Sequence, residues 1–275
     1  MNAASNVSAL TAPLKFRSIF LSDIHLGCKG CQADFLLDFL RRTDSEYLYL
    51  VGDIFDGWEM KKKSYWPASH QSIVNAILEK AAKGTRIIYT PGNHDESARH
   101  YCGHSFDNIE IRDTAIHTTA DNRKFLILHG DQFDSVVKYS PFLAKIGSSM
   151  YIRLLFLNRI INGARRLIGL PYWSLAAHLK HKVKNVVNYI GKFEEAVVAS
   201  ARLQKVQGVV CGHIHHAEMM MFSDILYCNT GDWVESCTAM VENHNGKLEI
   251  LKWTERSIRF KASECKQATP ALNAS

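Results

Sequence analysis

Residues 86–95 read Arg-Ile-Ile-Tyr-Thr-Pro-Gly-Asn-His-Asp, an apolar run followed at once by a turn that carries three polar side chains. The run predicts a short strand at Arg86–Thr90. Gly92 lets the backbone turn sharply where the strand ends. The strand would therefore deliver the Asn-His-Asp side chains of residues 93–95 just past its last apolar residue.

The same arrangement occurs four more times along the chain. Each time a short apolar run is followed by aspartate or histidine. The runs are Ser18–Leu21, Tyr47–Val51, Phe125–Leu128 and Gly208–Cys211. The segments that follow them are Ser22-Asp-Ile-His25, Gly52-Asp53, His129-Gly-Asp131 and Gly212-His-Ile-His215.

Apolar runs alternate with helical patterns along the chain, which is typical of a layered α/β fold. The chain has 275 residues, 47% of them hydrophobic, which suits one large α/β domain with an insertion. In open α/β sheets the functional site lies at the carboxyl ends of the strands. We therefore expect the polar side chains at the five strand ends to form one site.

These side chains are hard oxygen and imidazole donors, without a thiolate. Such a set suits manganese, iron, zinc or magnesium rather than a structural zinc cage. One motif of this kind is more often an ordinary loop, whereas five in series at strand ends are hard to explain by structure alone. Two cations held about 3.5–4 Å apart can neutralise a phosphate ester and activate water at neutral pH.

Taken together, the motifs resemble the calcineurin-like metallophosphoesterase family over roughly Lys15 to Trp253. The resemblance implies a four-layer αββα sandwich with a helical cap insertion. We expect flexible tails at 1–14 and 261–275, the phosphoesterase domain at 15–260, and the insertion at about 138–192. The motifs that carry the resemblance are Asp23-x-His25, Gly52-Asp53, Gly92-Asn-His-Asp95, His129 and Gly212-His-x-His215.

The resemblance also implies a dinuclear metal site in which Asp53 bridges two divalent ions. Mn²⁺ is the expected metal, with Fe, Zn and Mg as alternatives. The implied ligands of the first ion are Asp23, His25, Asp53 and His215. Those of the second ion are Asp53, Asn93, His129 and His213.

His94 directly follows one implied ligand, and the family pattern places it beside the leaving oxygen as a proton donor or charge stabiliser. Asp56 matches the carboxylate that orients this histidine in some members. A histidine with a carboxylate partner has a raised pKa, which suits an acid. For Asp56, capping of a turn is an equally good interpretation.

The charge of the chain is unevenly distributed. The net charge is +6, from 33 basic and 27 acidic residues. Between Asp134 and Glu194 there are ten basic residues and no acidic one, so this segment carries +10 and the rest of the chain −4. Helical patterns with many large apolar residues run from about Pro141 to Ile161 and from about Leu175 to Ala201, with a break at Gly169-Leu-Pro171.

A basic helical layer with bulky apolar residues suits an anionic lipid surface. A helical subdomain with a packed apolar core and solvated cations explains the segment equally well. Nucleic acid is a third interpretation, weakened because no nucleic-acid-binding module is recognisable.

Within the family, this basic segment resembles the helical cap of UDP-2,3-diacylglucosamine diphosphatases. The resemblance implies hydrolysis of a lipid-linked pyrophosphate by a cytoplasmic protein, peripheral on the cytoplasmic face of the inner membrane. Gly231-Asp-Trp233 and Gly169-Leu-Pro-Tyr-Trp173 fit that branch. The candidate substrate-binding residues are Arg153, Arg165, Arg166 and Trp173.

The best-known members of that branch have arginine where this chain has His94. Another lipid-linked or nucleotide pyrophosphate is therefore an alternative substrate. A phosphodiesterase or phosphatase acting on a soluble nucleotide or nucleic acid is a second possible function. A non-catalytic scaffold is the third, although all seven ligand-type side chains are present.

The seven cysteines are odd in number and irregularly spaced, so no disulfide framework is expected. A zinc or redox role for Cys28 and Cys31 would need a second pair or a thioredoxin-like context, so reduced thiols are the default. Met1–Pro13 lacks the pattern of a signal peptide. The chain has no uncharged apolar run of about 18 residues, so no membrane-spanning helix is expected.

Overall fold

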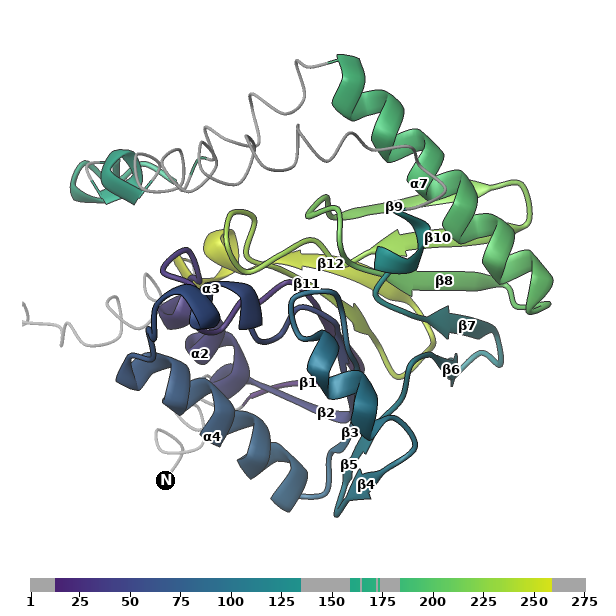
Figure 1. Cartoon of the computed structure of the whole chain (residues 1–275), viewed down its shortest axis with the longest axis horizontal. Helices are drawn as coiled ribbons and strands as arrows, with labels where there is room; N and C mark the ends of the chain where they lie inside the picture. The colour runs from purple at the N-terminus through teal and green to yellow at the C-terminus, as the bar shows by residue number, and fades with distance from the viewer. Residues whose placement is uncertain (1–12, 135–158, 164, 172, 174–183, 259–275) are drawn as a thin grey trace, which may run out of the picture.

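The computed structural model of the chain describes residues 13–134, 159–163, 165–171, 173 and 184–258 (Figure 1). Two mixed β-sheets lie face to face at its centre, a seven-stranded sheet of order β12-β11-β1-β2-β3-β5-β4 and a five-stranded sheet of order β6-β7-β8-β10-β9. The first sheet consists of β1 (Leu14–Leu21), β2 (Thr43–Val51), β3 (Arg86–Thr90), β4 (Ser105–Phe106), β5 (Ile109–Ile111), β11 (Thr238–Glu242) and β12 (Leu248–Lys252). The second consists of β6 (Ala115–Thr118), β7 (Lys124–Ile127), β8 (Gly208–Cys211), β9 (Glu218–Phe222) and β10 (Ile225–Asn229).

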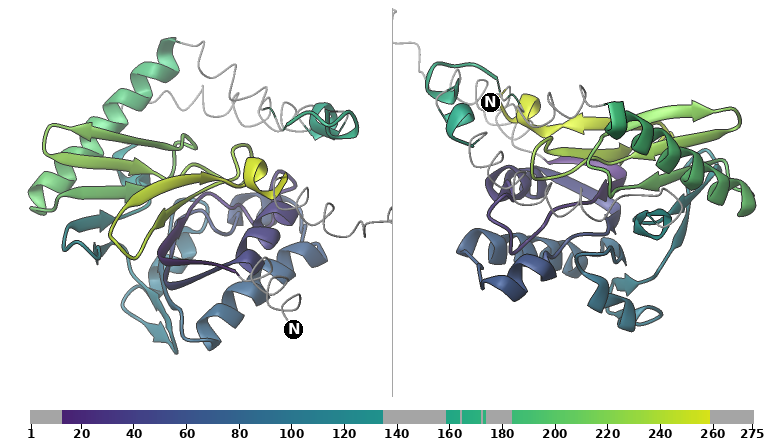
Figure 2. Two further views of the ribbon diagram at one scale, coloured as in Figure 1. Left: turned by 180° about the vertical axis from the view of Figure 1, so that it is seen from behind. Right: turned by 45° about the horizontal axis from the view of Figure 1, so that its top comes forward.

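Helices cover the outer faces of both sheets (Figures 1 and 2). Two of them, α2 (Ala33–Arg42) and α4 (Ala68–Ala82), pack on the seven-stranded sheet, and α7 (Lys184–Leu203) packs on the five-stranded sheet. A short helix α3 and two 3₁₀ turns lie in the connecting loops. Their bounds are Gly57–Lys62 for α3, Glu96–Tyr101 for η1 and Asp131–Phe133 for η2.

Three buried clusters correspond to the three interfaces between these layers. Leu36 and Phe39 of α2 are buried against the first sheet, and Phe193 and Val197 of α7 are buried against the second. The middle cluster joins side chains of both sheets, because apolar residues on the inner faces meet there. It includes Phe20, Tyr49, Val51, Ile88, Phe125, Ile127, Val210 and Met240. The predicted four-layer αββα sandwich is confirmed.

All five predicted strands are present, and β3 and β8 have the predicted bounds. Strands β1, β2 and β3 are parallel neighbours, with Leu21 paired to Leu50 and Val51 paired to Thr90. In the second sheet β7 is parallel to β8. The loops that leave the carboxyl ends of each set therefore start at one edge of its sheet.

The predicted insertion at about 138–192 lies mostly outside the described residues, as do the tail 261–275 and most of the tail 1–14. Its final part is helix α7, whose buried residues Phe193 and Val197 lie beyond the predicted boundary. The carboxyl-terminal half of α7 therefore belongs to the outer layer of the sandwich.

The six cysteines among the described residues are free. Burial raises the pKa of both Cys28 and Cys31, so neither thiol is activated. Within the described ranges, no helix has the length and apolar character to cross a membrane.

Candidate metal centre

The predicted ligands lie on the loops that follow β1, β2, β3, β7 and β8. Five of them have a left-handed backbone, which is costly for residues with a side chain. Such strain gathers at functional sites because the surrounding structure must hold it in place. The five residues and their φ angles are Asp23 (51°), His25 (55°), Asp53 (53°), His213 (71°) and His215 (54°).

Two glycines leave space for this cluster. A Cβ on Gly92 would collide with Asp53 and His129, and a Cβ on Gly212 would collide with the carboxylate of Asp23. Any other residue would push the predicted ligands apart. The glycines beside the ligand motifs therefore serve close approach of the backbone.

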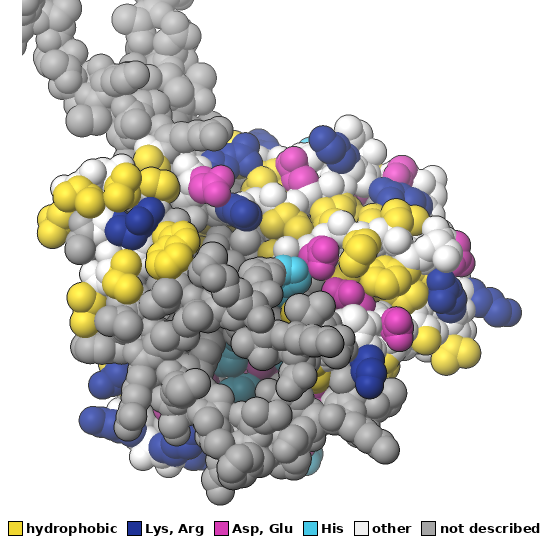
Figure 3. Space-filling model, turned by 90° about the horizontal axis from the view of Figure 1, so that it is seen from above, with side chains coloured by type: hydrophobic (Ala, Val, Ile, Leu, Met, Phe, Trp, Pro, Cys, Tyr) yellow, Lys and Arg dark blue, Asp and Glu magenta, His cyan; other side chains and the backbone are white. Residues whose placement is uncertain are grey.

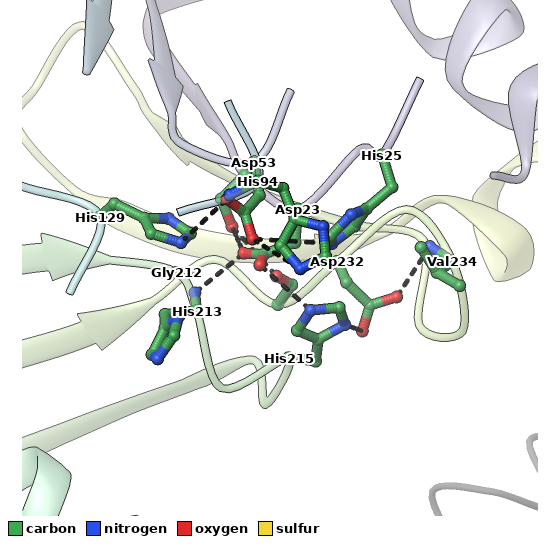
Figure 4. A network of polar contacts seen from close by, with 12 residues as sticks. Asp23, His25, Asp53, His94, His129, Gly212, His213, His215, Asp232 and Val234 are labelled. Atoms are coloured by element: carbon green, nitrogen blue, oxygen red, sulfur yellow. Dashed lines mark hydrogen bonds and ion pairs between the residues drawn. The ribbon is translucent and has the colours of Figure 1, made fainter. Parts of the chain in front are cut away.

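Histidine and carboxylate side chains converge on one region between these loops (Figure 4). The described residues contain three groups whose ligand atoms lie within 4.8 Å of one another. The groups are Asp23–His25–His215, His25–Asp53–His94 and Asp23–Asp53–His129. When the molecule is seen from above, histidine side chains are visible on its surface (Figure 3).

The carboxylates of Asp23 and Asp53 connect the groups. His215 Nε2 lies 3.1 Å from Asp23 Oδ1, and His129 Nε2 lies 3.4 Å from Asp53 Oδ1. Burial raises the pKa of Asp23, but the charge and close contact of His215 together with the charge of His129 outweigh burial and lower the pKa to about 2. Burial lowers the pKa of His129, but Asp53 outweighs it and raises the pKa to about 10. Asp23 is thus ionised, and His129 holds a proton that a bound cation would displace.

Several buried polar atoms in this cluster make no hydrogen bond. A native protein seldom leaves such atoms unsatisfied unless a ligand or ion binds them. They belong to three histidines, one asparagine and one aspartate that were predicted as ligands, and all are atom types that coordinate divalent metals. They are Asp23 Oδ1, His25 Nε2, Asn93 Oδ1, His129 Nε2 and His215 Nδ1. The residues present therefore fit divalent cations.

His213 is oriented differently from the other predicted ligands. Its backbone N–H donates to Asp23 Oδ2 at 2.9 Å, but its ring Nε2 lies 2.8 Å from Asp134 Oδ1. The ring of His213 lies 5.1 Å from the ring of His129. His213 therefore lies beside the cluster. Because its Nε2 contacts Asp134, Nδ1 is the ring nitrogen that would coordinate a metal.

His94 and Asp56 lie together, as predicted. Asp56 Oδ1 is 3.0 Å from His94 Nδ1, and Asp56 Oδ2 is 3.3 Å from His25 Nδ1. Burial raises the pKa of Asp56, but these two histidines outweigh it and hold the pKa well below the usual range. Oδ1 also accepts the N–H of Glu59 at the start of α3 at 2.9 Å. Asp56 thus contacts both histidines and also caps a helix.

Helix α3 contributes a contact that the sequence did not indicate. Trp58, about half exposed, lies over His94 with ring centroids 4.0 Å apart. The N–H of Gly57 donates to the carbonyl of His94 at 3.0 Å. His94 is therefore held by the cap, the backbone and the aromatic ring of one short helix.

The profile of the calcineurin-like phosphoesterase family matches residues 16–217, nearly three quarters of the chain. The chain belongs to the calcineurin-like phosphoesterase family. Membership in this family of hydrolases implies divalent metal ions at the centre described above.

Two curated relatives resemble this phosphoesterase at low identity. A UDP-2,3-diacylglucosamine hydrolase of Aliivibrio fischeri (strain MJ11) is 24% identical over 225 residues, covering 78% of this chain and 90% of the relative. A UDP-2,3-diacylglucosamine hydrolase of Histophilus somni (strain 129Pt) is 22% identical over 242 residues, covering 84% and 97%. Among solved structures, an archaeal phosphodiesterase matches with a TM-score of 0.41 and 14% identity, covering 85% of this chain and 98% of that one.

The phosphoesterase uses three further aspartates that sequence reasoning gave no role. Asp95 accepts the N–H groups of Ile54 and Gly92 at 2.8 and 2.6 Å, and so joins the loops after β2 and β3. Asp134 and Asp232 lie beside two predicted ligands, His213 and His215. Asp95 was visible in the motif after β3 and Asp232 in Gly231-Asp-Trp233, whereas Asp134 is recognisable only from the fold.

The candidate substrate residues are only partly described, because Arg153 lies outside the described residues. Arg165 lies over the ring of Trp173 at 5.9 Å, and Arg165 Nε donates to the Pro171 carbonyl at 3.2 Å. Arg166 lies on the same segment, next to Leu167, which is 89% exposed. These contacts of Arg165 lie within the segment itself.

Proposed function

We propose that this phosphoesterase hydrolyses the pyrophosphate bond of UDP-2,3-diacylglucosamine or a related lipid-linked nucleotide sugar, using two divalent cations. The observation that carries the proposal is the buried set of carboxylates, imidazoles and amide oxygen with ligand atoms that make no hydrogen bond. Mn²⁺ is the proposed metal, because hard oxygen and imidazole donors suit it.

The proposed ligands divide between the two ions. Asp23, His25, Asp53 and His215 would hold the first ion, and Asp53, Asn93, His129 and His213 the second. Asp53 fits the shared position because its two oxygens lie 3.4 Å from His129 and 3.9 Å from His25. When bound, such a pair of cations offsets the charge of the phosphate and activates water.

His94 is the proposed proton donor to the leaving oxygen. Its Nδ1 is held by Asp56, and its Nε2 lies 4.0 Å from Asp53 Oδ2, on the side of the cluster. The Asp56 carboxylate fixes the orientation of the His94 ring through this contact. Trp58 covers the ring and restricts its rotation. A positioned acid of this kind is worth roughly 10²–10⁴ in rate.

The lipid-linked substrate is supported by the names of the two curated relatives and by the segment that precedes α7. The described part of that segment exposes apolar side chains next to Arg165 and Arg166. An anionic, acyl-bearing substrate would match both features. The exposed apolar residues are Ile160, Leu167, Ile168 and Leu170.

Product analysis tests the substrate. The full chain, supplied with Mn²⁺, should release UMP and a lipid monophosphate from UDP-2,3-diacylglucosamine. UDP-N-acetylglucosamine, which lacks the acyl chains, should be cleaved far more slowly. Equal rates on the two substrates, or faster cleavage of a simple phosphodiester, would favour a soluble nucleotide substrate. Failure to hydrolyse any phosphoester with metal bound would favour the scaffold.

Peripheral association with anionic lipid is the second part of the proposal. Each basic residue near an anionic leaflet is worth about 1 kcal/mol. Reversing Arg165 and Arg166 to Glu should therefore weaken binding to anionic vesicles at least roughly tenfold in a sedimentation assay. The matched control reverses Arg202 at the end of α7 and Lys205 just after it, and should bind normally. Vesicle binding that is unaffected by added salt and by reversal of Arg165 and Arg166 would refute the proposed membrane association.

A further inference from the structure

A polar cavity lies away from the metal centre, between the two sheets. Its volume is about 230 Å³, and its lining comes from β1, β2, β3, β5, β6 and the residue after β5. None of the residues that line it is a predicted metal ligand or His94. Its polar lining includes Arg17, Tyr47, Arg86, Glu110, Arg112 and His117.

The cavity and the metal centre occupy different levels of the sheet. Tyr47 is paired with Arg86, and four residues later Val51 is paired with Thr90 at the carboxyl ends of these strands. Four residues of extended strand span about 13 Å. A ligand in the cavity would therefore contact other side chains than a substrate at the metal centre.

The guanidinium groups of this cavity outnumber the carboxylates that contact them. Glu110 is shared, with Oε1 2.9 Å from Arg86 and Oε2 2.5 Å from Arg112. Arg17 contacts both oxygens of Glu242 at 3.0 Å, but Glu242 also contacts His117 at 2.7 Å. Three guanidinium groups thus face two carboxylates, which leaves one positive charge in excess.

The guanidinium groups also keep donors for a ligand. In the contacts named above, each bonds the protein through a single terminal nitrogen, and each has further N–H groups. The side chains of Arg86 and Arg112 are 56% and 52% exposed, so a solute can reach them. Arg17 and Arg86 both lie over the ring of Tyr47, at 5.5 and 5.8 Å, which holds them in place.

We propose that this cavity binds a small anion that carries a phosphate group, independently of the metal centre. Planar guanidinium groups bind phosphate oxygens in pairs, which suits a site with three of them. The volume equals that of roughly eight water molecules. It is smaller than the usual pocket for a drug-sized ligand. Inorganic phosphate, or the phosphate group of a nucleotide or sugar, matches this size.

Calorimetric titration of the full chain in EDTA tests the site. One arm uses inorganic phosphate and the other UMP, so that free phosphate and a phosphomonoester are distinguished. Binding to at least one should be seen with a stoichiometry of one. Arg86→Gln and Arg112→Gln should each weaken it roughly tenfold or more, because each removes charge-assisted hydrogen bonds. Added salt should also weaken binding of the anion to the wild-type protein.

Two controls separate this site from others. Arg202→Gln removes an arginine of similar exposure that pairs with Asp224 outside the cavity, and should leave binding unchanged. His94→Gln alters the metal centre and should also leave it unchanged. Absence of binding by both anions would overturn the proposal. So would binding that survives both cavity variants or disappears in His94→Gln.

Discussion

The metal-facing loops and the arginine-lined cavity lie on the same two sheets but are built in opposite ways. The loops carry carboxylates and imidazoles on five residues with left-handed backbone, and three of these, Asp23, His25 and Asp53, are buried. The cavity carries arginines and tyrosines that project from ordinary strand positions, such as Tyr47 and Arg86. The first site needs strained, glycine-flanked turns, and the second needs only a particular set of side chains across the sheet interface.

This difference has a consequence for substitutions. Each ligand in the loops depends on its neighbours, so single changes should have large effects on metal binding and rate. The cavity is bordered by exposed side chains, so its variants should fold normally. Buried Glu242 beneath Arg17 is the exception, because it contacts Ser18, His117 and the N–H of Ala120 as well.

The largest effect is expected for Asp53→Ala. Removal of the proposed bridging carboxylate should lower the metal content sharply and bring hydrolysis close to background, because both ions lose a ligand. Metal analysis and a phosphodiesterase assay on the same preparation measure this. Asp224→Ala, at an exposed ion pair, is the control and should behave as wild type. Full metal occupancy in Asp53→Ala would contradict the bridging role.

His94→Ala should lower kcat by roughly 10²–10⁴ while the metal content stays near normal. The reason is that His94 is proposed to transfer a proton rather than to bind metal. The loss should be greatest for a poor leaving group, which needs protonation most. His104→Ala is the matched control, because His104 is exposed and its side chain contacts Tyr101 rather than the proposed ligands. Unchanged turnover on a poor leaving group would remove His94 from the mechanism.

Glu242→Gln should reduce the free energy of unfolding by about 3 kcal/mol at pH 7. Burial raises the pKa of Glu242, but His117, Ser18 and the Ala120 N–H outweigh burial and lower the pKa from 4.5 to about 2. A carboxylate with a lowered folded-state pKa contributes stability above pH 4.5, and this contribution is lost as the pH falls towards 2.

Denaturant titrations at several pH values measure that effect. The wild type should lose stability between pH 4.5 and 2 more steeply than Glu242→Gln. Glu249→Gln changes a partly exposed glutamate that accepts a hydrogen bond from Asn243 within the same β11–β12 hairpin, and should change stability by less than about 0.5 kcal/mol. Parallel acid profiles of wild type and Glu242→Gln would show that Glu242 is not the coupled group.

The smallest effect is expected for Trp58→Ala. An aromatic contact is worth about 0.5–1.5 kcal/mol, so kcat should fall roughly two- to tenfold through looser positioning of His94. Trp58→Phe should recover most of the loss because it restores a ring at the contact. Trp66→Ala, which removes a ring stacked on Phe55 instead, should leave kcat near normal. If KM rises while kcat stays constant, Trp58 contacts substrate rather than positioning His94.

The sequence by itself determined the strand ends and the residues that follow them. Arg86–Thr90 and Gly208–Cys211 were predicted with their observed bounds, because each is a short apolar run bounded by turn residues. The order of the ligand-type residues was also present in the sequence, because each motif is local and contains its own glycine or turn. These signals need no knowledge of distant contacts.

Only the tertiary structure decided which side chains meet. His213 turns its Nε2 to Asp134, 79 positions away, and Trp58 covers His94 through a helix that no periodic pattern marked. Arg17 reaches Glu242 across 225 positions, and that contact brings two charges of the cavity together. Such pairs leave no local pattern in the sequence, because their energy comes from contacts that exist only after the two sheets have packed.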